Sequence, residues 1–340
     1  MPLLIKSDDV LMLLGIESDD VLIRIFVRVP VFSHGALRCA CRRTNTLLKS
    51  PVFREARLKS GFDETALIVA GGVQDRRAVT GCSMVIGGRC RPIAPMTTPR
   101  AFACSAVMEN ELVVLGGSAG GDALATVEAY DPLLNRWRSL PPMSQGRQGA
   151  VCGLVGGSLV VAGGGSLTTG SLSTAEAYSP ETGWTPLPPL PHAAWSAAAC
   201  VLDGRLYVAG GVSSSKLQMW NGAEWSVLCD MPAARNGAAG AAHPSGKVMV
   251  MGGRLRGNVP YETLVYDPRR DRWATATPLP QVRPGQEVHA WCTAIEHTGG
   301  LVLFGDRSAL RFADDAWAGP PYPPLAWATA RSCVGSMFLG

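Results

Sequence analysis

Glycine pairs that follow hydrophobic runs are the first residues here whose type and spacing could serve chemistry. One of them, VVLGGSAGGD at residues 113–122, has the glycine density of a phosphate-binding loop. Such a loop leads its glycines into a helix N-terminus, and in nucleotide-binding versions a Lys and a Ser or Thr follow. Here the glycines lead toward another β-rich run, and no GK[ST] follows. We therefore expect these glycines to turn the chain rather than to hold a phosphate.

Cysteines and histidines are the second set of residues that could serve chemistry, as metal ligands. The chain has 10 Cys and 5 His, but no CxxC pair, and the histidines show no ligand spacing (His34, His192, His243, His289, His297). Cys104, Cys152 and Cys200 lie 48 residues apart, each in the strand before a glycine pair. We expect them at equivalent heights in separate sheets as small hydrophobic residues, with no metal and no cofactor.

Composition and charge narrow the possible partners and the compartment. Residues 1–62 hold 10 basic and 6 acidic residues, while the remaining 21 basic and 21 acidic residues cancel, so the net charge of +4 is too weak to predict nucleic-acid binding. No apolar stretch approaches the roughly 20 residues of a membrane span. The diluted cysteines and the absence of a secretory signal favour reduced thiols in the cytoplasm or the nucleus.

The glycine pairs recur along the chain. They close the runs ALIVAGG, LVVLGG, LVVAGG, LYVAGG and VMVMGG, and LVLFGD is a degenerate sixth copy. Their first glycines are 45, 47, 47, 42 and 53 residues apart. An aromatic residue and then a Trp follow most of the copies (Tyr130 and Trp137, Tyr178 and Trp184, Trp220 and Trp225, Tyr266 and Trp273, Phe312 and Trp317). A phased repeat of this length is typical of a propeller.

Turn signals between the runs predict antiparallel hairpins within each repeat. Asp203–Gly204, Gly156–Gly157 and Ser245–Gly246 suit two-residue turns, and the runs beside them are short and β-rich. Each repeat therefore reads as a four-stranded sheet that buries its faces only against its neighbours. We predict a mainly β fold, a six-bladed propeller over residues 63–340, in which residues 330–340 supply the strand that the first sheet lacks.

The phased glycine pair, Tyr and Trp resemble the kelch family, from about Glu64 to Gly340. The first copy is degenerate, because Val85 and Cys90 occupy its aromatic positions.

Residues 1–62 form a different module, because they lack glycine pairs and have a helical period. Val21, Leu22, Ile25, Phe26 and Val29 predict a first helix behind Asp19 and Asp20, ended by Pro30. A second helix is predicted after Ser33, with one apolar face (Leu37, Ala40, Cys41, Thr44, Leu47, Leu48). Ser50 is expected to cap a third helix, with Pro51 at its first position and Gly61 beyond its end.

This module resembles the F-box, especially that of plant-type kelch proteins. The resemblance lies in DDVLIRIFVRVP, LRCACRR, LLKSPVF and the junction GFDETALIV. It departs from the family where Glu17–Ser18 replace Leu-Pro and Thr44 replaces an aromatic residue, two positions of the family's adaptor contact. The resemblance implies a surface for a Skp-type adaptor, for which we expect contributions from the apolar helix positions (Leu22, Ile25, Phe26, Pro30, Leu37). The alternative is a helical cap that docks on the propeller.

Together the two resemblances imply a non-catalytic substrate-recognition subunit of a Skp–cullin–F-box ubiquitin ligase. The helices would bind the adaptor and thereby the cullin ligase, and the propeller would hold a target protein for ubiquitination. One alternative is an interaction scaffold whose F-box has degenerated. Another is a kelch enzyme of the copper-oxidase kind, whose His and Tyr ligands and Tyr–Cys crosslink are not apparent.

A phased Arg marks the turn into the next repeat and is our candidate for target binding. It ends MTTPR, MSQGR, MPAAR and LPQVR, while LPHAAW breaks the series (Arg100, Arg147, Arg235, Arg283, with Arg331 comparable, and His192 and Trp195 at the break). Equivalent positions should gather at one channel mouth, joined by the loops after the glycine pairs (Ser118, Ser166, Ser213, Arg254, Arg307). A ring of guanidinium groups favours an acidic or phosphorylated segment. The alternative is that each Arg satisfies backbone carbonyls between sheets.

Overall fold

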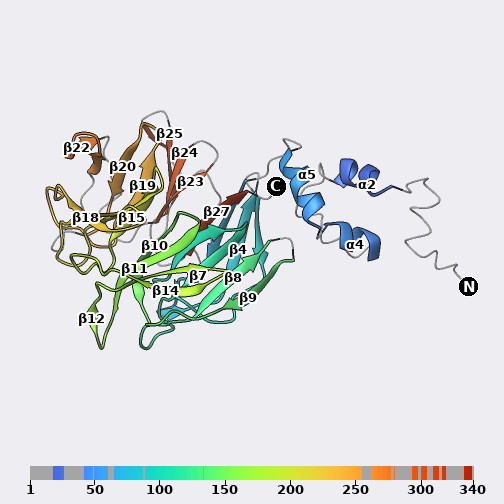
Figure 1. Cartoon of the computed structure of the whole chain (residues 1–340), viewed down its shortest axis with the longest axis horizontal. Helices are drawn as coiled ribbons and strands as arrows, with labels where there is room; N and C mark the ends of the chain where they lie inside the picture. The colour runs from blue at the N-terminus through green and yellow to red at the C-terminus, as the bar shows by residue number, and fades with distance from the viewer. Residues whose placement is uncertain are drawn as a thin grey trace, which may run out of the picture.

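The computed structural model describes most of the 340-residue chain, namely residues 18–26, 42–48, 50–59, 65–86, 89–132, 134–254, 262–276, 279, 293–297, 300–304, 309–313, 316–318 and 333–338. Its helices precede the strands and lie beside them at one end of the long axis (Figure 1): α2 (Asp19–Phe26), α4 (Arg42–Leu48) and α5 (Pro51–Lys59). Within these ranges no helix has the length and apolar character needed to cross a bilayer.

The strands form antiparallel sheets in chain order, and the chain is a mainly β propeller. The first sheet runs β27-β1-β4-β5 and has a side hairpin, β2-β3. The second runs β6-β7-β8-β9, and the third β10-β11-β13-β14, with β12 paired to β11. The bounds in these sheets are β1 (Thr65–Ala70), β2 (Val73–Gln74), β3 (Arg77–Ala78), β4 (Cys82–Ile86), β5 (Arg89–Ile93), β6 (Cys104–Met108), β7 (Glu111–Leu115), β8 (Val127–Asp131), β9 (Arg136–Leu140), β10 (Gln148–Val155), β11 (Ser158–Ser166), β12 (Gly170–Ser171), β13 (Ala175–Ser179), β14 (Gly183–Leu187) and β27 (Cys333–Phe338).

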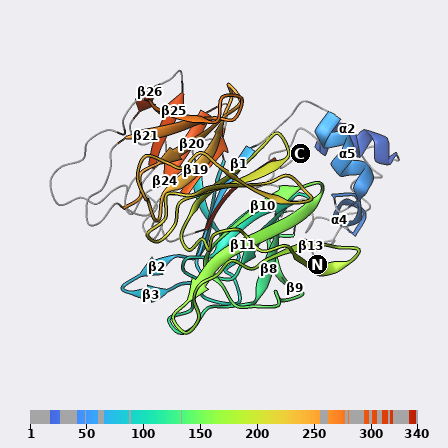
Figure 2. The same ribbon diagram turned by 60° about the vertical axis from the view of Figure 1, so that its left-hand side comes forward.

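Three more sheets repeat the same up-and-down order, each from four consecutive strands. Figure 2 shows them, from yellow to red, beside the sheets of the first half of the chain. Their strands are β15 (Ala198–Leu202), β16 (Arg205–Ala209), β17 (Leu217–Trp220), β18 (Trp225–Leu228), β19 (Ala239–His243), β20 (Lys247–Met251), β21 (Thr263–Asp267), β22 (Arg272–Ala276), β23 (Thr293–His297), β24 (Gly300–Phe304), β25 (Ala309–Ala313) and β26 (Ala316–Ala318).

Two-residue turns join the first two strands of the second, third and fourth sheets. The two-residue turn predicted at Ser245–Gly246 is wrong, because residues 244–246 together connect β19 to β20 and Ser245 has no positive φ. Between β10 and β11, Gly156 and Gly157 have φ of 58° and 80°, and between β15 and β16, Asp203 and Gly204 have φ of 50° and 69°. Two successive positive φ angles give the turn a twist that matches the strands on either side. The register of each hairpin is thereby fixed at its turn.

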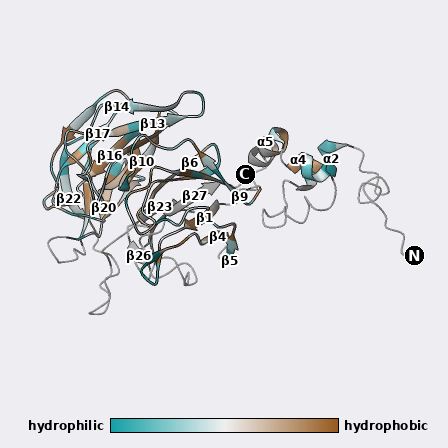
Figure 3. Cartoon of the chain, turned by 90° about the horizontal axis from the view of Figure 1, so that it is seen from below, coloured by the Kyte–Doolittle hydropathy of each residue, from teal (hydrophilic) through white to brown (hydrophobic). Residues whose placement is uncertain are grey.

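Apolar side chains of neighbouring sheets bury one another. One cluster joins the second and third sheets through Val113, Leu115, Leu159 and Val161, which are almost completely buried. Outer strands such as β9 and β22 consist of exposed and half-buried residues, whereas β20, which Figure 3 colours largely hydrophobic, is almost wholly buried. Each sheet therefore buries its faces against its neighbours while its last strand faces solvent.

The glycine pairs tie neighbouring sheets together. The amide of the second glycine donates to the carbonyl of the residue that ends the next repeat's Met or Leu motif (Gly72 to Arg100 at 2.7 Å, Gly117 to Arg147 at 2.9 Å, Gly164 to Ala194 at 2.7 Å, Gly211 to Arg235 at 2.8 Å). A Cβ on Gly116, whose φ is 62°, would lie 2.2 Å from the carbonyl oxygen of Arg147. Close backbone approach between sheets thus explains these glycines, and no helix follows them.

The Trp of the second, third, fourth and fifth repeats makes a second contact with the preceding repeat. Its indole Nε1 donates to a carbonyl just beyond the preceding outer strand (Trp137 to Ala94 at 2.8 Å, Trp184 to Pro141 at 2.8 Å, Trp225 to Pro188 at 3.0 Å, Trp273 to Cys229 at 2.8 Å). Its ring lies 5.2–5.4 Å from the aromatic ring across the hairpin (Tyr130, Tyr178, Trp220, Tyr266). The predicted Tyr–Trp motif is therefore structural.

The three phased cysteines do not share a height, so that part of the prediction is wrong. Cys104 pairs with Leu115, Cys152 with Val161 and Cys200 with Tyr207, which stand one, two and three residues before their glycine pairs. The cysteines are 48 residues apart, but these glycine pairs are 47 apart, so each sheet shifts the thiol by one position. Burial raises the pKa of the Cys200 thiol to about 12, which keeps it protonated and unreactive.

Candidate functional site

The helical module has a small core of its own. Leu22 and Ile23 of α2 pack with Leu47 and Leu48 of α4 and with Phe53 of α5. The predicted cap is confirmed, because the Ser50 hydroxyl accepts the Phe53 amide at 3.1 Å. Ser18 likewise accepts the Asp20 amide at 3.1 Å at the start of α2. Arg43 and Asp19 join α4 to α2 through an ion pair of 2.8 Å.

This core corrects part of the expected adaptor surface. Leu22 is buried in the core, so its side chain holds the module together rather than meeting a partner. Thr44, which replaces the family's aromatic residue, is also buried. Ile25 and Phe26 belong to α2, but their side chains lie outside the described part, as do Pro30 and Leu37 altogether.

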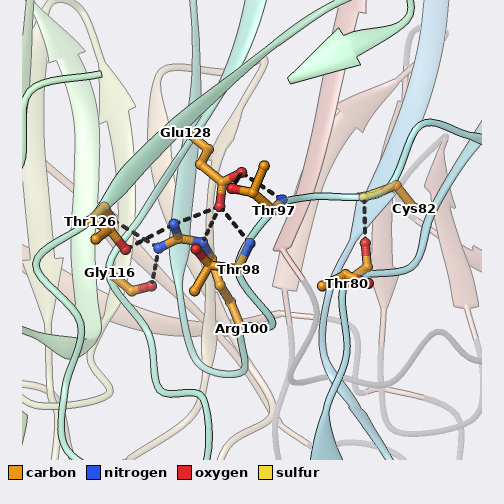
Figure 4. A network of polar contacts seen from close by, with 8 residues as sticks. All are labelled: Thr80, Cys82, Thr97, Thr98, Arg100, Gly116, Thr126 and Glu128. Atoms are coloured by element: carbon orange, nitrogen blue, oxygen red, sulfur yellow. Dashed lines mark hydrogen bonds and ion pairs between the residues drawn. The ribbon is translucent and has the colours of Figure 1, made fainter. Parts of the chain in front are cut away.

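The phased arginines lie inside the propeller, which corrects their assignment to a target-binding ring. Arg100 is 1% exposed, and its guanidinium donates to the Gly116 and Thr126 carbonyls at 2.9 and 2.8 Å (Figure 4). It also forms an ion pair of 2.8 Å with the buried Glu128. All three acceptors belong to the second sheet, so the alternative reading, in which Arg satisfies backbone carbonyls, is correct.

The third sheet repeats this network at the same positions. Arg147, also 1% exposed, donates to the Gly163 and Thr174 carbonyls at 2.7 and 3.0 Å and pairs with the buried Glu176 at 3.0 Å. Because its backbone carbonyl accepts the Gly117 amide, Arg147 bonds the second sheet through its main chain and the third through its side chain. No bound partner could reach its guanidinium without unfolding the site.

The fifth sheet carries a weaker version of the network. Arg235 is buried and donates to the Glu262 carbonyl at 2.8 Å and to the Gly252 carbonyl at 3.4 Å. The Glu262 carboxylate is mostly exposed and lies 3.8 Å from the guanidinium. Burial therefore lowers the pKa of Arg235, and Glu262 compensates only in part. Arg283 and Arg331 lie outside the described residues.

Carboxylates in this network also hold the turn that precedes each inner strand. Glu128 accepts the Thr97 amide at 2.8 Å, the Thr97 hydroxyl at 2.5 Å and the Thr98 amide at 3.1 Å. Burial alone would raise the pKa of Glu128, but the bonds from Thr97 and Arg100 outweigh burial and lower it. The carboxylate therefore stays ionised inside the protein.

The fourth sheet lacks the charged network altogether. Ala194 stands where the other repeats have Arg, since its carbonyl accepts the Gly164 amide as theirs do. Gln218 replaces the Glu and exchanges two hydrogen bonds with the His192 main chain, at 2.8 and 3.0 Å. Both charges are thus absent together, and no buried charge is left without a partner. His192, at the break in the series, is an exposed residue that here contributes main-chain groups.

Trp195 follows Ala194 and fits against glycines of the third sheet. A Cβ on Gly165 would lie 2.6 Å from Trp195 Cδ2, and one on Gly149 would lie 2.8 Å from Trp195 Cδ1. Gly165 is the third glycine of its run, whereas the other described repeats have Val73, Ser118, Val212 or Arg254 after the pair. The extra glycine gives the indole its space.

A cleft of about 360 Å³ opens beside this Trp. Its walls come from the connections that enter the inner strands and from the loops after the glycine pairs of the second, third and fourth sheets. Its larger lining side chains are Phe102, Gln148, Leu167, Trp195 and Val212, and the remaining lining residues are Ser or Gly. None of the described residues that line it is charged.

Two residues that the sequence predicted at the channel mouth line this cleft, while other lining residues were not predicted. Trp195 and the loop residue Ser118 were expected there, and both line the cleft. Leu167 and Val212 were missed, although they are large apolar residues that are 78% and 45% exposed. The sequence feature that points to the cleft is an irregular repeat, because LPHAAW and the triple glycine depart from the repeat pattern in adjacent sheets.

Comparisons with known proteins agree with this division of the chain. The F-box domain family matches residues 18–55, and the Kelch motif matches residues 99–144 and 146–191. A relative, an F-box/kelch-repeat protein of Arabidopsis thaliana, is 25% identical over an alignment of 170 residues that covers 35% of this chain. The matched part spans only 41% of that relative's length.

A solved structure supports the propeller fold. The structure of YjhT superposes with a TM-score of 0.59 at 14% identity, covering 74% of this chain and 96% of that one. The F-box match at the N-terminus and the kelch motifs in the second and third sheets together support an F-box/kelch-repeat protein.

Proposed function

We propose that this chain is the non-catalytic substrate-recognition subunit of a Skp–cullin–F-box ubiquitin ligase. The observation that carries the proposal is the presence of an F-box and kelch motifs in one chain. The helices would bind a Skp-type adaptor and, through it, the cullin ligase, while the propeller holds the target. Two binding surfaces on one chain raise the target's effective concentration beside the ubiquitin-charged enzyme.

The six sheets are proposed to close into one six-bladed ring over residues 63–340, with residues 1–62 as the adaptor module. Inner strands contact one another in cyclic order (β27, β6, β10, β15, β19, β23 and again β27). The C-terminal β27 pairs with β1 over six residues, from Thr65 with Phe338 to Ala70 with Cys333.

Removing residues 330–340 should expose the edge of β1 and lower the melting temperature by on the order of 10 °C. An unchanged melting curve would contradict the closure.

Adaptor binding is the direct test of the ligase role. We expect the full chain to co-purify with a Skp-type adaptor, and the double substitution Ile25→Ala, Phe26→Ala to abolish this while the propeller melts unchanged. Arg24→Ala on the same helix is the matched control, because Arg24 is exposed. Loss of the helical circular dichroism in the double variant would point to a core role instead.

The alternative is an interaction scaffold with a degenerate F-box. Two observations favour it: Thr44, in place of the family's aromatic residue, is buried, and Ser18, in place of a Pro, serves as a helix cap. A chain that holds a target but binds no Skp-type adaptor would establish the scaffold and exclude the ligase role.

A further inference from the structure

The cleft beside Trp195 contains a polar side chain that the protein leaves without a partner. Gln148 is 8% exposed and lines the cleft, and among the described residues its amide group makes no hydrogen bond. The amide atoms are not among the fully buried, unpartnered polar atoms of the described residues, so they meet the water of the cleft, and a ligand that displaces this water has to replace its hydrogen bonds. Such a group in a cleft is suited to a ligand that supplies the missing donor and acceptor.

The rest of the cleft has the properties of an apolar anchor site. Leu167 and Val212 stand exposed at its rim, and Trp195 and Phe102 offer aromatic surface. Large apolar side chains that a folded protein leaves exposed together are typical of interaction sites. The volume of about 360 Å³ is near the lower end for small-ligand sites, so it fits one or two side chains rather than a whole helix.

Charge at the cleft disfavours an acidic ligand. No described lining residue is a cation. Asp122, beside the lining glycines, accepts the Thr168 hydroxyl at 3.0 Å and so links the rim loops of the second and third sheets. Hydrogen bonds from the Ala123 amide and from Thr168 lower the pKa of Asp122, which keeps the rim negative. A carboxylate or phosphate entering here would lose hydration and meet a like charge.

We propose that the cleft binds an uncharged, extended segment of a target protein, with one apolar side chain beside Trp195, Leu167 and Val212. The Gln148 amide then donates to the carbonyl and accepts from the N–H of the segment's backbone, because a carboxamide offers one group of each kind. This inference names the chemistry of the target that the ligase proposal requires, and it rests on that proposal for the target being a protein.

The position of the cleft supports this role. It lies where the repeat is broken, at Ala194 and Trp195, and beside the glycine that makes room for the indole. Sites at which a sequence departs from its own local rules without a loss of packing are expected to be functional. The buried charge pair is absent from the fourth repeat, which supplies Trp195 and Val212 to the cleft.

A displayed library of random linear nonapeptides is the probe for this site, selected against the full chain. We expect enrichment of sequences with one large apolar residue and depletion of Asp and Glu. Gln148→Leu should weaken the selected peptides at least tenfold without lowering the melting temperature, because the amide has no protein partner to lose. Leu167→Glu and Val212→Glu should do the same, and Asp122→Asn should increase tolerance of acidic peptides.

Val227→Glu is the matched control, because Val227 is 48% exposed on the outer strand β18, away from the cleft. Enrichment of acidic peptides, no enrichment, or binding that survives the cleft substitutions would overturn the proposal. Adaptor co-purification is measured on the same variants. Cleft binding without adaptor binding would leave this inference standing and remove the ligase role, while adaptor binding without cleft binding would do the reverse.

Discussion

The third and fourth sheets have the same backbone arrangement, but different side chains lie where each sheet meets the sheet before it. We call these two contacts the third and the fourth junction. In the third, Arg147 and Glu176 are both buried and paired, and the guanidinium satisfies two carbonyls. In the fourth, Ala194 and Gln218 occupy these positions without charge, and Trp195 follows. The backbone bond to the preceding glycine pair is kept in both, at 2.9 Å and 2.7 Å. The fold therefore requires the main-chain tie, whereas the side chains beneath it can change if they change together.

Breaking the charged junction should have the largest effect. Arg147→Ala leaves the Glu176 carboxylate buried without its cation, which costs about 3–5 kcal/mol of unfolding free energy. The measurement is chemical denaturation of the full chain. Lys216→Ala is the control, because Lys216 pairs with Asp230 at the surface at 2.8 Å and its loss should cost no more than about 1 kcal/mol. Equal losses in the two variants would contradict the structural role of Arg147.

Converting the third junction into the fourth should restore stability in part. Arg147→Ala with Glu176→Gln removes both charges, as Ala194 and Gln218 do in the fourth sheet. We expect the pair to recover about 2 kcal/mol relative to Arg147→Ala alone, since the uncompensated charge is gone while the cavity remains. A double variant no more stable than the single one would show that the two positions are not coupled.

The sequence predicted the repeats well because they follow from local chemistry. Glycine pairs, two-residue turns and the Tyr–Trp motif each impose their geometry within a few residues, and most of those in the described residues lie as expected, apart from the turn at Ser245–Gly246. The role of Arg100 and Arg147 could not be predicted in this way. An Arg exposed at a channel mouth and an Arg buried beneath a loop give the same sequence pattern. Their partners Glu128 and Glu176 are 28 and 29 residues away, and only the fold brings them together.

The cysteines show how small an error defeats a symmetry argument. A spacing of 48 rather than 47 residues moves each thiol one position along its strand, and one position reverses the face to which a side chain points. The cleft residues illustrate the opposite limit. Gln148 begins β10, whereas Leu167 and Val212 lie in two different loops, and nothing in their local sequence says that these segments converge.

A side chain added at Gly165 should disturb the contact between Trp195 and the third sheet. Gly165 does not have a positive φ, so Gly165→Ala is allowed by the backbone, but its Cβ would lie 2.6 Å from both Trp195 Cδ2 and the Gly170 carbonyl. We expect a loss of about 1–3 kcal/mol, typical of overpacking. Gly121→Ala is the control, because a Cβ there meets nothing within 4 Å. Trp195→Ala added to Gly165→Ala should cost less than the sum of the two single losses.

The smallest expected effect is a difference in how the two kinds of junction respond to acid. The pKa of Glu128 is lowered in the folded chain, because bonds from Thr97 and Arg100 outweigh the effect of burial. A carboxyl whose folded pKa lies below its unfolded value, roughly 4.3, contributes stability above that value and loses it as the pH falls through the folded pKa.

The variant Arg100→Ala with Glu128→Gln copies the uncharged fourth junction and removes this titration. Between pH 5 and pH 3 its unfolding free energy should fall less steeply than that of the unchanged chain, by at most about 1.4 kcal/mol per pH unit for one proton. Val227→Ser alters no titratable group and should keep the original slope. Parallel slopes for all three chains would mean that Glu128 binds its proton equally well in the folded and unfolded states, and that the charged junction serves packing rather than electrostatics.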